Sequence, residues 1–339
     1  MTKIRLGGLK LWDGAAQVVL SSACEKHGLA GIVSGPLAAE KINIALLTHV
    51  AAGGESLCGT ALCVTRALGA SCSSLLRVPE PDLNGLRLQT DVSTISIFPH
   101  DQRLEIFGGL LLAIAEAGVK VRGLATSPST IVSVLPDPAV SRVVERLFGC
   151  FAFPDYATPT DWQARWRKFE RPSGEIVATY EEKVIRIYGI VEQTDLDLWS
   201  LFVLPPSLAD LGAAMEMLAR FGLKLPFLVA LPGPGERLLF AFCMATLAGD
   251  EIERVLAAHL PGSSVRRRRR VAALFLHGPH FGDRYGIANA LIRALEHSDT
   301  EILALGCAVS SISVVINAED IPAATGALET AFSIPRAKD

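Results

Sequence analysis

The stretch GDRYGIANALIRALEHSDTEILALGCAVSSISVVI, residues 282–316, decides how the rest of this chain is interpreted. A glycine-containing loop leads into a run in which Ile287, Leu291 and Leu295 recur at helical spacing, which predicts an amphipathic helix. Two short runs rich in aliphatic and β-branched residues follow within 301–318 and predict two strands. With a strand expected before the loop and a helix after the second of these strands, the predicted order is β-α-β-β-α.

The same order is expected three more times, beginning at Ala16, Val92 and Trp199. An independent feature supports this alignment, because fifteen positions separate the residue at each expected helix start from the residue at the next strand start. The four pairs, in chain order, are Gly28 and Asn43, Glu105 and Lys120, Ala209 and Lys224, and Gly286 and Glu301. Self-similarity of this kind indicates one supersecondary unit used several times.

The repeat predicts the architecture. A βαββαβ unit forms an antiparallel sheet with both helices on one face, and a unit this small gains stability by packing against neighbours. We therefore predict an α+β protein of four ferredoxin-like βαββαβ units arranged as a duplicated pair. The expected boundaries are unit one at 1–77, unit two at 78–152, a linker at 153–180, unit three at 181–262 and unit four at 263–339.

Three of the four units are preceded by a further pattern. An Asp-containing turn separates two apolar-polar runs, and turn residues of this kind reverse a chain. A β-hairpin is therefore predicted before units one to three, with Asp13, Asp91 and Asp195 in the turns.

Composition and charge exclude several classes of protein. Of the 339 residues, 50% are hydrophobic and the formal net charge is -3, so neither disorder nor a general attraction to nucleic acid or anionic membranes is expected. No apolar run approaches the roughly 20 residues that cross a bilayer, and the N-terminus lacks the pattern of a signal peptide. The seven cysteines are scattered without a CxxC pair, which favours reduced thiols and a cytoplasmic location.

Two of the units carry motifs that resemble the ACT domains, most closely the paired ACT regulatory region of aspartate kinases. In that family an acidic residue, two variable residues, a glycine and an aliphatic residue open the first helix. Asp283–Ile287 match this pattern, and Glu25–Leu29 match it with Glu in place of Asp. Ile42–Asn43 match the opening of the second strand, and Ser310–Ser311 match the Ser-rich turn before the third. Unit four departs from the pattern at Glu301, and units two and three lack the loop glycine and its acidic residue.

The resemblance covers nearly the whole chain as architecture. It implies a regulatory function and an amino-acid ligand held between two ACT units. Aspartate kinases also carry an N-terminal catalytic domain with a Lys-Phe-Gly-Gly opening, which this sequence lacks, so the resemblance implies a regulatory region without its kinase. We therefore expect no enzymatic activity, no catalytic residues and no cofactor.

The loops of units one and four offer the groups that bind a free amino acid. A helix N-terminus presents unpaired N–H groups and a partial positive charge, which suit a carboxylate, and glycine lets a ligand approach the backbone. A nearby acid can pair with an ammonium group, and an Asn side chain both donates and accepts hydrogen bonds. The predicted ligand-binding residues are Glu25, His27, Gly28, Leu29, Asn43, Ile44, Asp283, Tyr285, Gly286, Ile287 and Glu301.

These residues also have a purely structural interpretation. An acidic residue before a helix commonly serves as an N-cap or a dipole partner, and Gly28 and Gly286 can serve only to turn the chain. His27 can be an exposed loop residue without a role. His277 and His280 have no cysteine or carboxylate at metal-ligand spacing, so no metal site is predicted.

The run Arg266–Arg270 is the strongest charge feature of the sequence. Such a run can contact phosphate groups or nucleic acid. It leads directly into an expected strand and contains no aromatic residues, which favours a solvated linker or a charged sheet edge that resists aggregation.

Together these observations predict a cytoplasmic protein that senses a small amino acid at an interface between units and signals to a partner. The partner is expected to be another copy of the chain or an enzyme of amino-acid metabolism, and no membrane or nucleic acid is expected. Two alternatives stay open at this point. One is a structural or interaction protein whose ACT units bind no ligand, and the other is polyanion binding through the arginine run.

Overall fold

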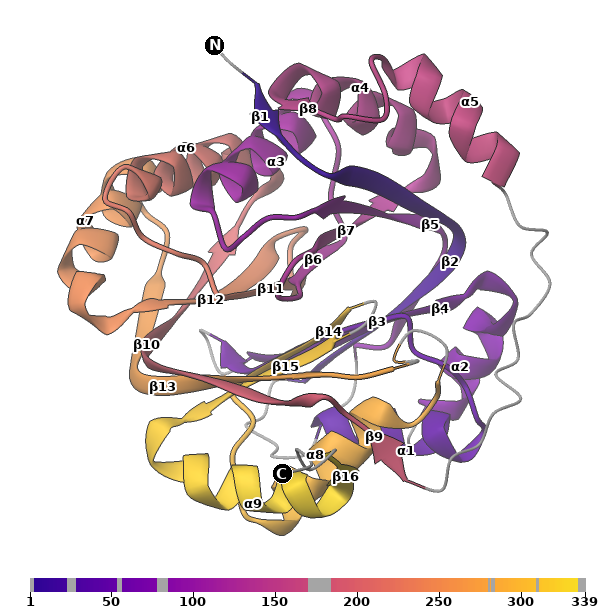
Figure 1. Ribbon diagram of the computed structural model, residues 1–339, viewed down its shortest axis with the longest axis vertical. Helices are drawn as coiled ribbons and strands as arrows, with labels where there is room; N and C mark the ends of the chain where they lie inside the picture. The colour runs from indigo at the N-terminus through magenta and orange to yellow at the C-terminus, as the bar shows by residue number, and fades with distance from the viewer. Residues whose placement is uncertain are drawn as a thin grey trace, which may run out of the picture.

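The long strands of the chain form one closed sheet, and most of the helices lie on its outer faces (Figure 1). The computed structural model describes residues 3–22, 29–53, 57–77, 85–169, 184–279, 281, 284–308 and 311–334. Within these residues the order β-α-β-β-α occurs four times, as predicted, and the fold is of the α+β type. We refer to the four runs as the first to the fourth segment.

The first segment consists of β2 (Gly8–Ser22), α1 (Leu29–Ala39), β3 (Leu46–Gly53), β4 (Leu57–Thr65) and α2 (Gly69–Leu75). The second consists of β5 (Arg87–Phe98), α3 (Leu104–Glu116), β6 (Gly123–Thr126), β7 (Ile131–Pro136) and α4 (Val140–Cys150). The third consists of β10 (Gly189–Val203), α6 (Leu208–Ala219), β11 (Phe227–Pro232), β12 (Leu238–Ala245) and α7 (Gly249–His259). The fourth consists of β13 (Val265–His277), α8 (Ile287–His297), β14 (Ala304–Ala308), β15 (Ser311–Asn317) and α9 (Ile321–Ala331).

The remaining elements are short or stand between the segments. In each segment a one-turn 3-10 helix precedes an α-helix, and the fourth segment has one at Ala318–Asp320. Two small parallel pairs join distant parts of the chain, β1 (Ile4–Arg5) with β8 (Phe151–Ala152) and β9 (Ile185–Arg186) with β16 (Phe332–Ser333). Between the second and third segments lies α5 (Pro159–Phe169), whose Trp162 is buried and donates from Nε1 to the carbonyl of Leu9 at 3.1 Å.

The predicted hairpins before units one to three are wrong. The structure has instead one continuous strand at each place, β2, β5 and β10. In β2 the pairing with β5 shifts register between Trp12 and Ala15, and Gly14 there has φ +70. In β10 the shift lies beside Asp195, which has φ 57. A bulge with a left-handed residue bends and twists a strand without reversing it, so turn-like residues at these points do not make a turn.

The bulges let consecutive segments exchange strand halves. Gly8–Trp12 of β2 pair with Thr94–Phe98 of β5, whereas the part of β2 after the bulge pairs with the beginning of β5. The strands β10 and β13 are paired in the same way around their own bulges. Each segment therefore supplies an edge strand to the sheet of its neighbour, and this exchange fastens the first segment to the second and the third to the fourth.

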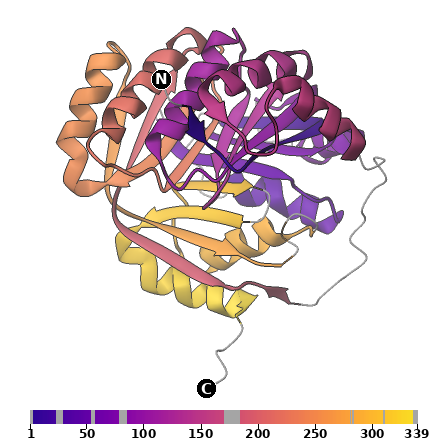
Figure 2. The same cartoon turned by 45° about the horizontal axis from the view of Figure 1, so that its top comes forward.

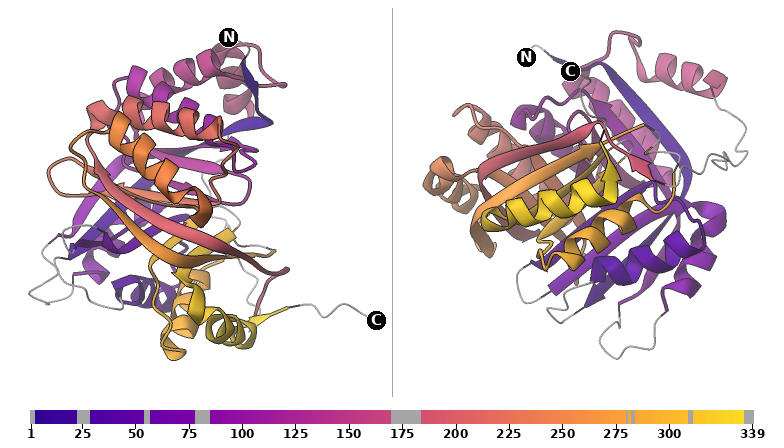
Figure 3. Two further views of the ribbon diagram at one scale, coloured as in Figure 1. Left: turned by 90° about the vertical axis from the view of Figure 1, so that its left-hand side faces the viewer. Right: turned by 60° about the horizontal axis from the view of Figure 1, so that its bottom comes forward.

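Two further strand pairs close the ring. The second and third segments meet at β6 and β11, with α3 and α6 packed on the outer face, and we call this boundary the upper seam (Figure 1). The first and fourth segments meet at β3 and β14, with α1 and α8 outside, and we call this boundary the lower seam. The helices of each seam form one layer, and the two helical layers lie on opposite sides of the strands (Figures 2 and 3).

Both faces of the strands are buried, which explains the high apolar content. Along β2, Val18 and Leu20 pack into the cluster beneath the helices of the lower seam, whereas Val19 points into a separate cluster enclosed by the strands. A third cluster fills the space beneath the helices of the upper seam. Alternate residues of a strand face opposite sides, so a strand between two apolar layers needs apolar residues at nearly every position. Among the described residues, no helix is long and apolar enough to cross a membrane.

The arginine run lies on the first half of β13, where the strand pairs with β10 on one side. Arg267 donates from Nε to Asp197 at 2.6 Å, and its guanidinium lies 5.1 Å from the ring centre of Trp199. Arg268 donates to Glu301 at 2.7 Å and to Asn317 at 2.8 Å. The run therefore forms a charged strand edge, and two of its side chains are bound within the chain.

Candidate functional site

The lower seam is built around a local two-fold axis. In the pairing of β3 with β14, Thr48 lies opposite Gly306, Leu47 opposite Cys307, and His49 opposite Leu305. In the alignment of the repeats, Leu47 is equivalent to Leu305 and His49 is equivalent to Cys307. Each of these residues therefore pairs with the equivalent of the other, on either side of the central pair, as a two-fold axis requires. The helices α1 and α8 have equal length and lie side by side above these strands.

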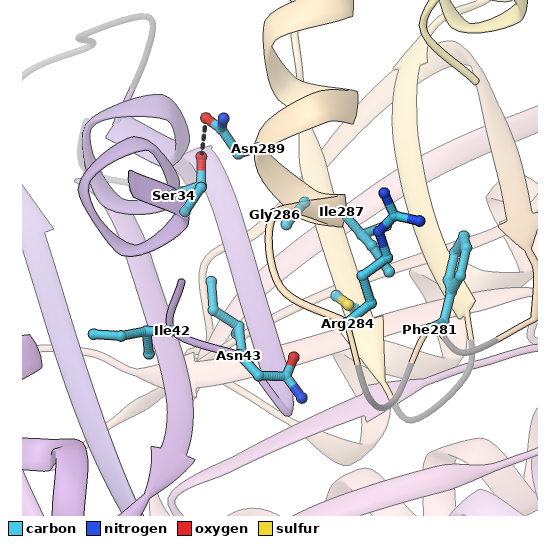
Figure 4. Close-up of a pocket in the computed structure, with 12 residues that line it drawn as sticks. Ser34, Ile42, Asn43, Phe281, Arg284, Gly286, Ile287 and Asn289 are labelled. Carbon is cyan, nitrogen blue, oxygen red and sulfur yellow. Dashed lines mark hydrogen bonds between the residues drawn. The ribbon is translucent and has the colours of Figure 1, made fainter. Parts of the chain in front are cut away.

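A cavity lies at this seam and is lined from both segments (Figure 4). It measures about 320 Å³, counted with the open solvent at its mouth. The first segment contributes residues from the second half of α1 and from the connection to β3, and the fourth contributes the loop and first turn of α8. The lining residues are Ser34, Ala38, Ile42, Asn43, Ile44, Phe281, Arg284, Gly286, Ile287, Ala288, Asn289 and Cys307.

Gly286 forms the N-terminal end of α8 at the cavity. It is the N-cap residue with φ 81, a left-handed conformation that glycine adopts readily and that strains other residues. A Cβ atom built there would have only the Ala38 Cβ nearby, at 3.8 Å, so the need for glycine comes from the backbone conformation. Among the described residues no side chain caps this helix end, and the first turn of α8 contains no acidic residue. The free N–H groups of the first turn are therefore not neutralised by the helix itself.

Polar side chains surround this helix end. Asn43 reaches the cavity from the first segment, and Arg284 belongs to the loop before α8 (Figure 4). Asn289, in the first turn, accepts from Ser34 Oγ across the seam at 3.4 Å. The wall thus combines one cationic side chain with two amides, which suits a small ligand that carries both a carboxylate and hydrogen-bond donors.

The other part of the cavity is apolar. Phe281, Ile42 and Ile287 are buried, with exposures of 6%, 6% and 4%. Cys307 also lines the cavity, and burial raises the pKa of its thiol to about 12. A thiol with such a pKa is protonated near neutral pH and behaves as a small apolar group, not as a nucleophile.

The structure brings together four of the predicted ligand-binding residues and separates others. Asn43, Ile44, Gly286 and Ile287 line the one cavity although they come from opposite ends of the chain. Asn43 lies in the connection before β3 and not within the strand. Glu25, His27, Gly28 and Asp283 lie outside the described residues.

Three predicted residues do not line the cavity. Leu29 is buried at the first residue of α1. The ring centre of Tyr285 lies 6.0 Å from the Nζ of Lys41. The carboxylate of Glu301 pairs with Arg268.

Several lining residues were not predicted from the sequence, notably Ser34, Ala38, Arg284 and Asn289. Arg284 and Asn289 flank the predicted loop glycine and could have been found from that position alone. Ser34 and Ala38 carry no motif, because they reach the site only through the pairing of two distant segments. The described residues contain no group of three His, Cys, Asp or Glu that could hold a metal ion.

At a corresponding place of the upper seam, the described main chain is joined directly across the boundary. Arg103 and Lys224 form a main-chain bridge, and the N–H of Leu225 donates to the carbonyl of Gln102 at 2.8 Å. The loop before α3 is therefore joined directly to the chain before β11. At the matching position of the lower seam, the corresponding loop and strand leave the cavity between them.

The helix packing at one set of equivalent positions also differs between the two seams. Gly108 of α3 and Gly212 of α6 pack so closely that a Cβ on Gly108 would lie 2.8 Å from the Gly212 carbonyl oxygen. The equivalent positions in α1 and α8, twelve before Asn43 and Glu301, are Gly31 and Asn289. The α8 position carries the Asn289 side chain where α3 and α6 have glycine, and α1 and α8 pack less extensively than α3 and α6.

No family model and no curated protein matches this sequence. Among solved structures, the aspartate kinase from Synechocystis is similar with a TM-score of 0.77 and 15% identity, over 98% of this chain and 57% of that chain. This chain thus spans just over half the length of that kinase. The ligand-free regulatory subunit of aspartate kinase from Thermus thermophilus is 20% identical, over 43% of this chain and 99% of that subunit, with a TM-score of 0.39. The predicted resemblance to aspartate kinases is confirmed at the level of fold.

Proposed function

We propose that this chain is a regulatory protein of four ferredoxin-like ACT units, arranged as a duplicated pair, which binds a free amino acid in the cavity of the lower seam. The observation that carries the proposal is that one cavity contains the glycine-capped N-terminus of α8 together with Asn43 from the other end of the sequence. The repeat of element order, the strand exchange and the likeness to the Synechocystis kinase over nearly the whole chain support the architecture.

The chemistry of the cavity fits an α-amino acid. The first-turn N–H groups of α8 and the Arg284 guanidinium attract the ligand carboxylate. The Oδ1 of Asn43 accepts from the ligand ammonium group, and Asp283 remains the predicted anionic partner of that group. The ligand side chain then lies toward Phe281 and Ile44, which selects a small or apolar group.

Binding at a seam also supplies a way to signal. A ligand that contacts both segments stabilises the arrangement in which α1, α8, β3 and β14 are correctly placed. A ligand shifts an equilibrium only by its difference in affinity for the two states, and here that difference comes from contacts present only when the seam is formed. We propose that the partner that responds to this change is another copy of the chain or an enzyme of amino-acid metabolism. We also propose that the chain itself has no catalytic activity.

A second candidate function is that of an interaction protein without a ligand. The upper seam favours it, because there the corresponding place is closed by main-chain pairing and by helix contact at Gly108 and Gly212. Polyanion binding is less well supported, because Arg267 and Arg268 form bonds within the chain.

Titration calorimetry and thermal shift with each of the twenty amino acids test the proposal. We expect one amino acid, or a small group of similar ones, to give heat and to raise Tm. Replacing Asn43 with Ala removes one charge-assisted hydrogen bond, so the affinity should fall by about tenfold or more.

The matched control is Lys120→Ala, at the equivalent position of the upper seam, where the side chain makes an exposed ion pair with Glu236. This control should leave the affinity unchanged. A folded protein that shows neither heat nor a thermal shift with any of the twenty amino acids would exclude the proposal and leave the interaction protein as the better description.

A further inference from the structure

The two-fold axis of the lower seam creates a second position equivalent to the cavity. It lies where the first turn of α1 meets the end of α8 and the chain before β14. Both α1 and α8 contain eleven residues, so their positions correspond one to one. The local two-fold axis therefore relates this second position to the proposed amino-acid site.

The residues at the equivalent positions differ in charge. Ala38, the tenth residue of α1, lines the cavity close to Gly286. The tenth residue of α8 is Glu296. Likewise Asn43 of the cavity corresponds to Glu301, whose carboxylate pairs with Arg268. The second position has therefore gained two acidic residues where the first has an alanine and an amide.

Glu296 extends across the seam to the first turn of α1. A Cβ atom built on Gly31 would lie 2.5 Å from Glu296 Oε1 and within 3.4 Å of Oε2, so both carboxylate oxygens lie against this turn. The first turn of α1 has no acidic residue of its own. A carboxylate at a helix N-terminus is attracted by the helix dipole and by the free N–H groups, which is the interaction proposed for the ligand at α8.

From this geometry we propose that the Glu296 carboxylate occupies the second position in place of a ligand, so that each chain binds one amino acid and not two. This inference rests on the proposed function for its stoichiometry. Glu296 acts as a built-in carboxylate that holds the first turn of α1 against α8, and Gly31 is glycine because any side chain would displace it.

Exchange of residues between the two positions tests the stoichiometry. Wild-type protein should bind one amino acid per chain in titration calorimetry. The double variant Glu296→Ala and Glu301→Asn removes both acids and gives the second position the residues of the first at these two places, so it should bind two. Ala38→Glu introduces the acid into the cavity and should lower the affinity at least about tenfold. Two ligands per wild-type chain, or one per chain of the double variant, would overturn the inference but leave the proposed function in place.

A second measurement needs no ligand and separates the two proposals. In wild-type protein, Glu296→Ala should lower Tm, because the helix end loses its carboxylate. In a Gly31→Ala background the carboxylate is already displaced, so the same substitution should have little further effect. An equal loss of Tm in both backgrounds would show that Glu296 does not act at α1, whatever the result with amino acids.

Discussion

Asp197 gives a structural reason for part of the arginine run Arg266–Arg270. Its side chain has no solvent exposure, and a buried carboxylate is costly unless it is paired and hydrogen-bonded. It accepts from Arg267 Nε at 2.6 Å, from Thr246 Oγ1 at 2.9 Å and from the N–H of Arg270 at 3.2 Å. Part of the arginine run therefore serves this one carboxylate, and a sequence pattern that resembles a polyanion site has an internal explanation.

His49 leads to a prediction at the same scale. It is buried in β3, with Nδ1 2.8 Å from Thr60 Oγ1, and burial lowers its pKa to about 4. The unfolded chain has an ordinary histidine pKa near 6.5, so it binds more protons than the folded chain in acid. Stability is therefore full above about pH 6.5 and falls between about pH 6.5 and 4, by up to about 3 kcal/mol from this residue.

Urea unfolding at several pH values measures this effect. His49→Asn keeps a group that can bond to Thr60 but removes the titration, so the variant should show a shallower loss of stability in acid. Some slope should remain, because burial also lowers the pKa of His100. Equal slopes for the variant and the wild type would contradict the prediction.

At the scale of elements, the crossing of α3 and α6 is decided by two glycines. Gly108→Ala should lower the free energy of unfolding by about 1–3 kcal/mol, because the new Cβ would lie 2.8 Å from a backbone oxygen and the helices must separate. This loss should outweigh the gain of up to about 1 kcal/mol that alanine brings to a helix.

Gly149→Ala in α4 is the matched control for this measurement. A Cβ there would meet no atom within 4 Å, so only the gain in helix propensity remains. Chemical denaturation should show a loss for the first variant and none for the second. A stabilised Gly108→Ala protein would mean that the two helices can move apart without cost.

At the scale of the whole molecule, the two seams are expected to respond differently to the proposed ligand. The upper seam is closed by main-chain pairing and extensive helix contact, whereas the lower seam contains the cavity. In hydrogen exchange, the bound amino acid should slow the exchange of amides in β3 and β14. Amides of β6 and β11 should be slow from the start and should not change. Equal slowing at both seams would show that the ligand tightens the ring as a whole and not the lower seam.

Much of this architecture could be predicted from local patterns. The order β-α-β-β-α, repeated four times, was predicted from the alternation of apolar residues, the helical spacing after Gly286 and the fifteen-residue interval. These features could be used because they depend on neighbours in the chain. The hairpins were predicted wrongly at Asp13, Asp91 and Asp195. At Asp13 and Asp195 the reason is that a turn and a bulge use the same residues and differ only in which strand lies alongside.

The sequence by itself determined the repeated order of elements, the glycine at the start of α8, and the choice of Asn43 and Ile287 as candidate residues. Only the tertiary structure decided that the first segment meets the fourth, that Ser34 and Arg284 share a cavity, and that Glu296 reaches α1. The physical reason is that periodicity and capping act over a few residues. Which strand edges pair, and how closely two helices approach, depends on single side chains at contacts between parts of the chain that are far apart in sequence.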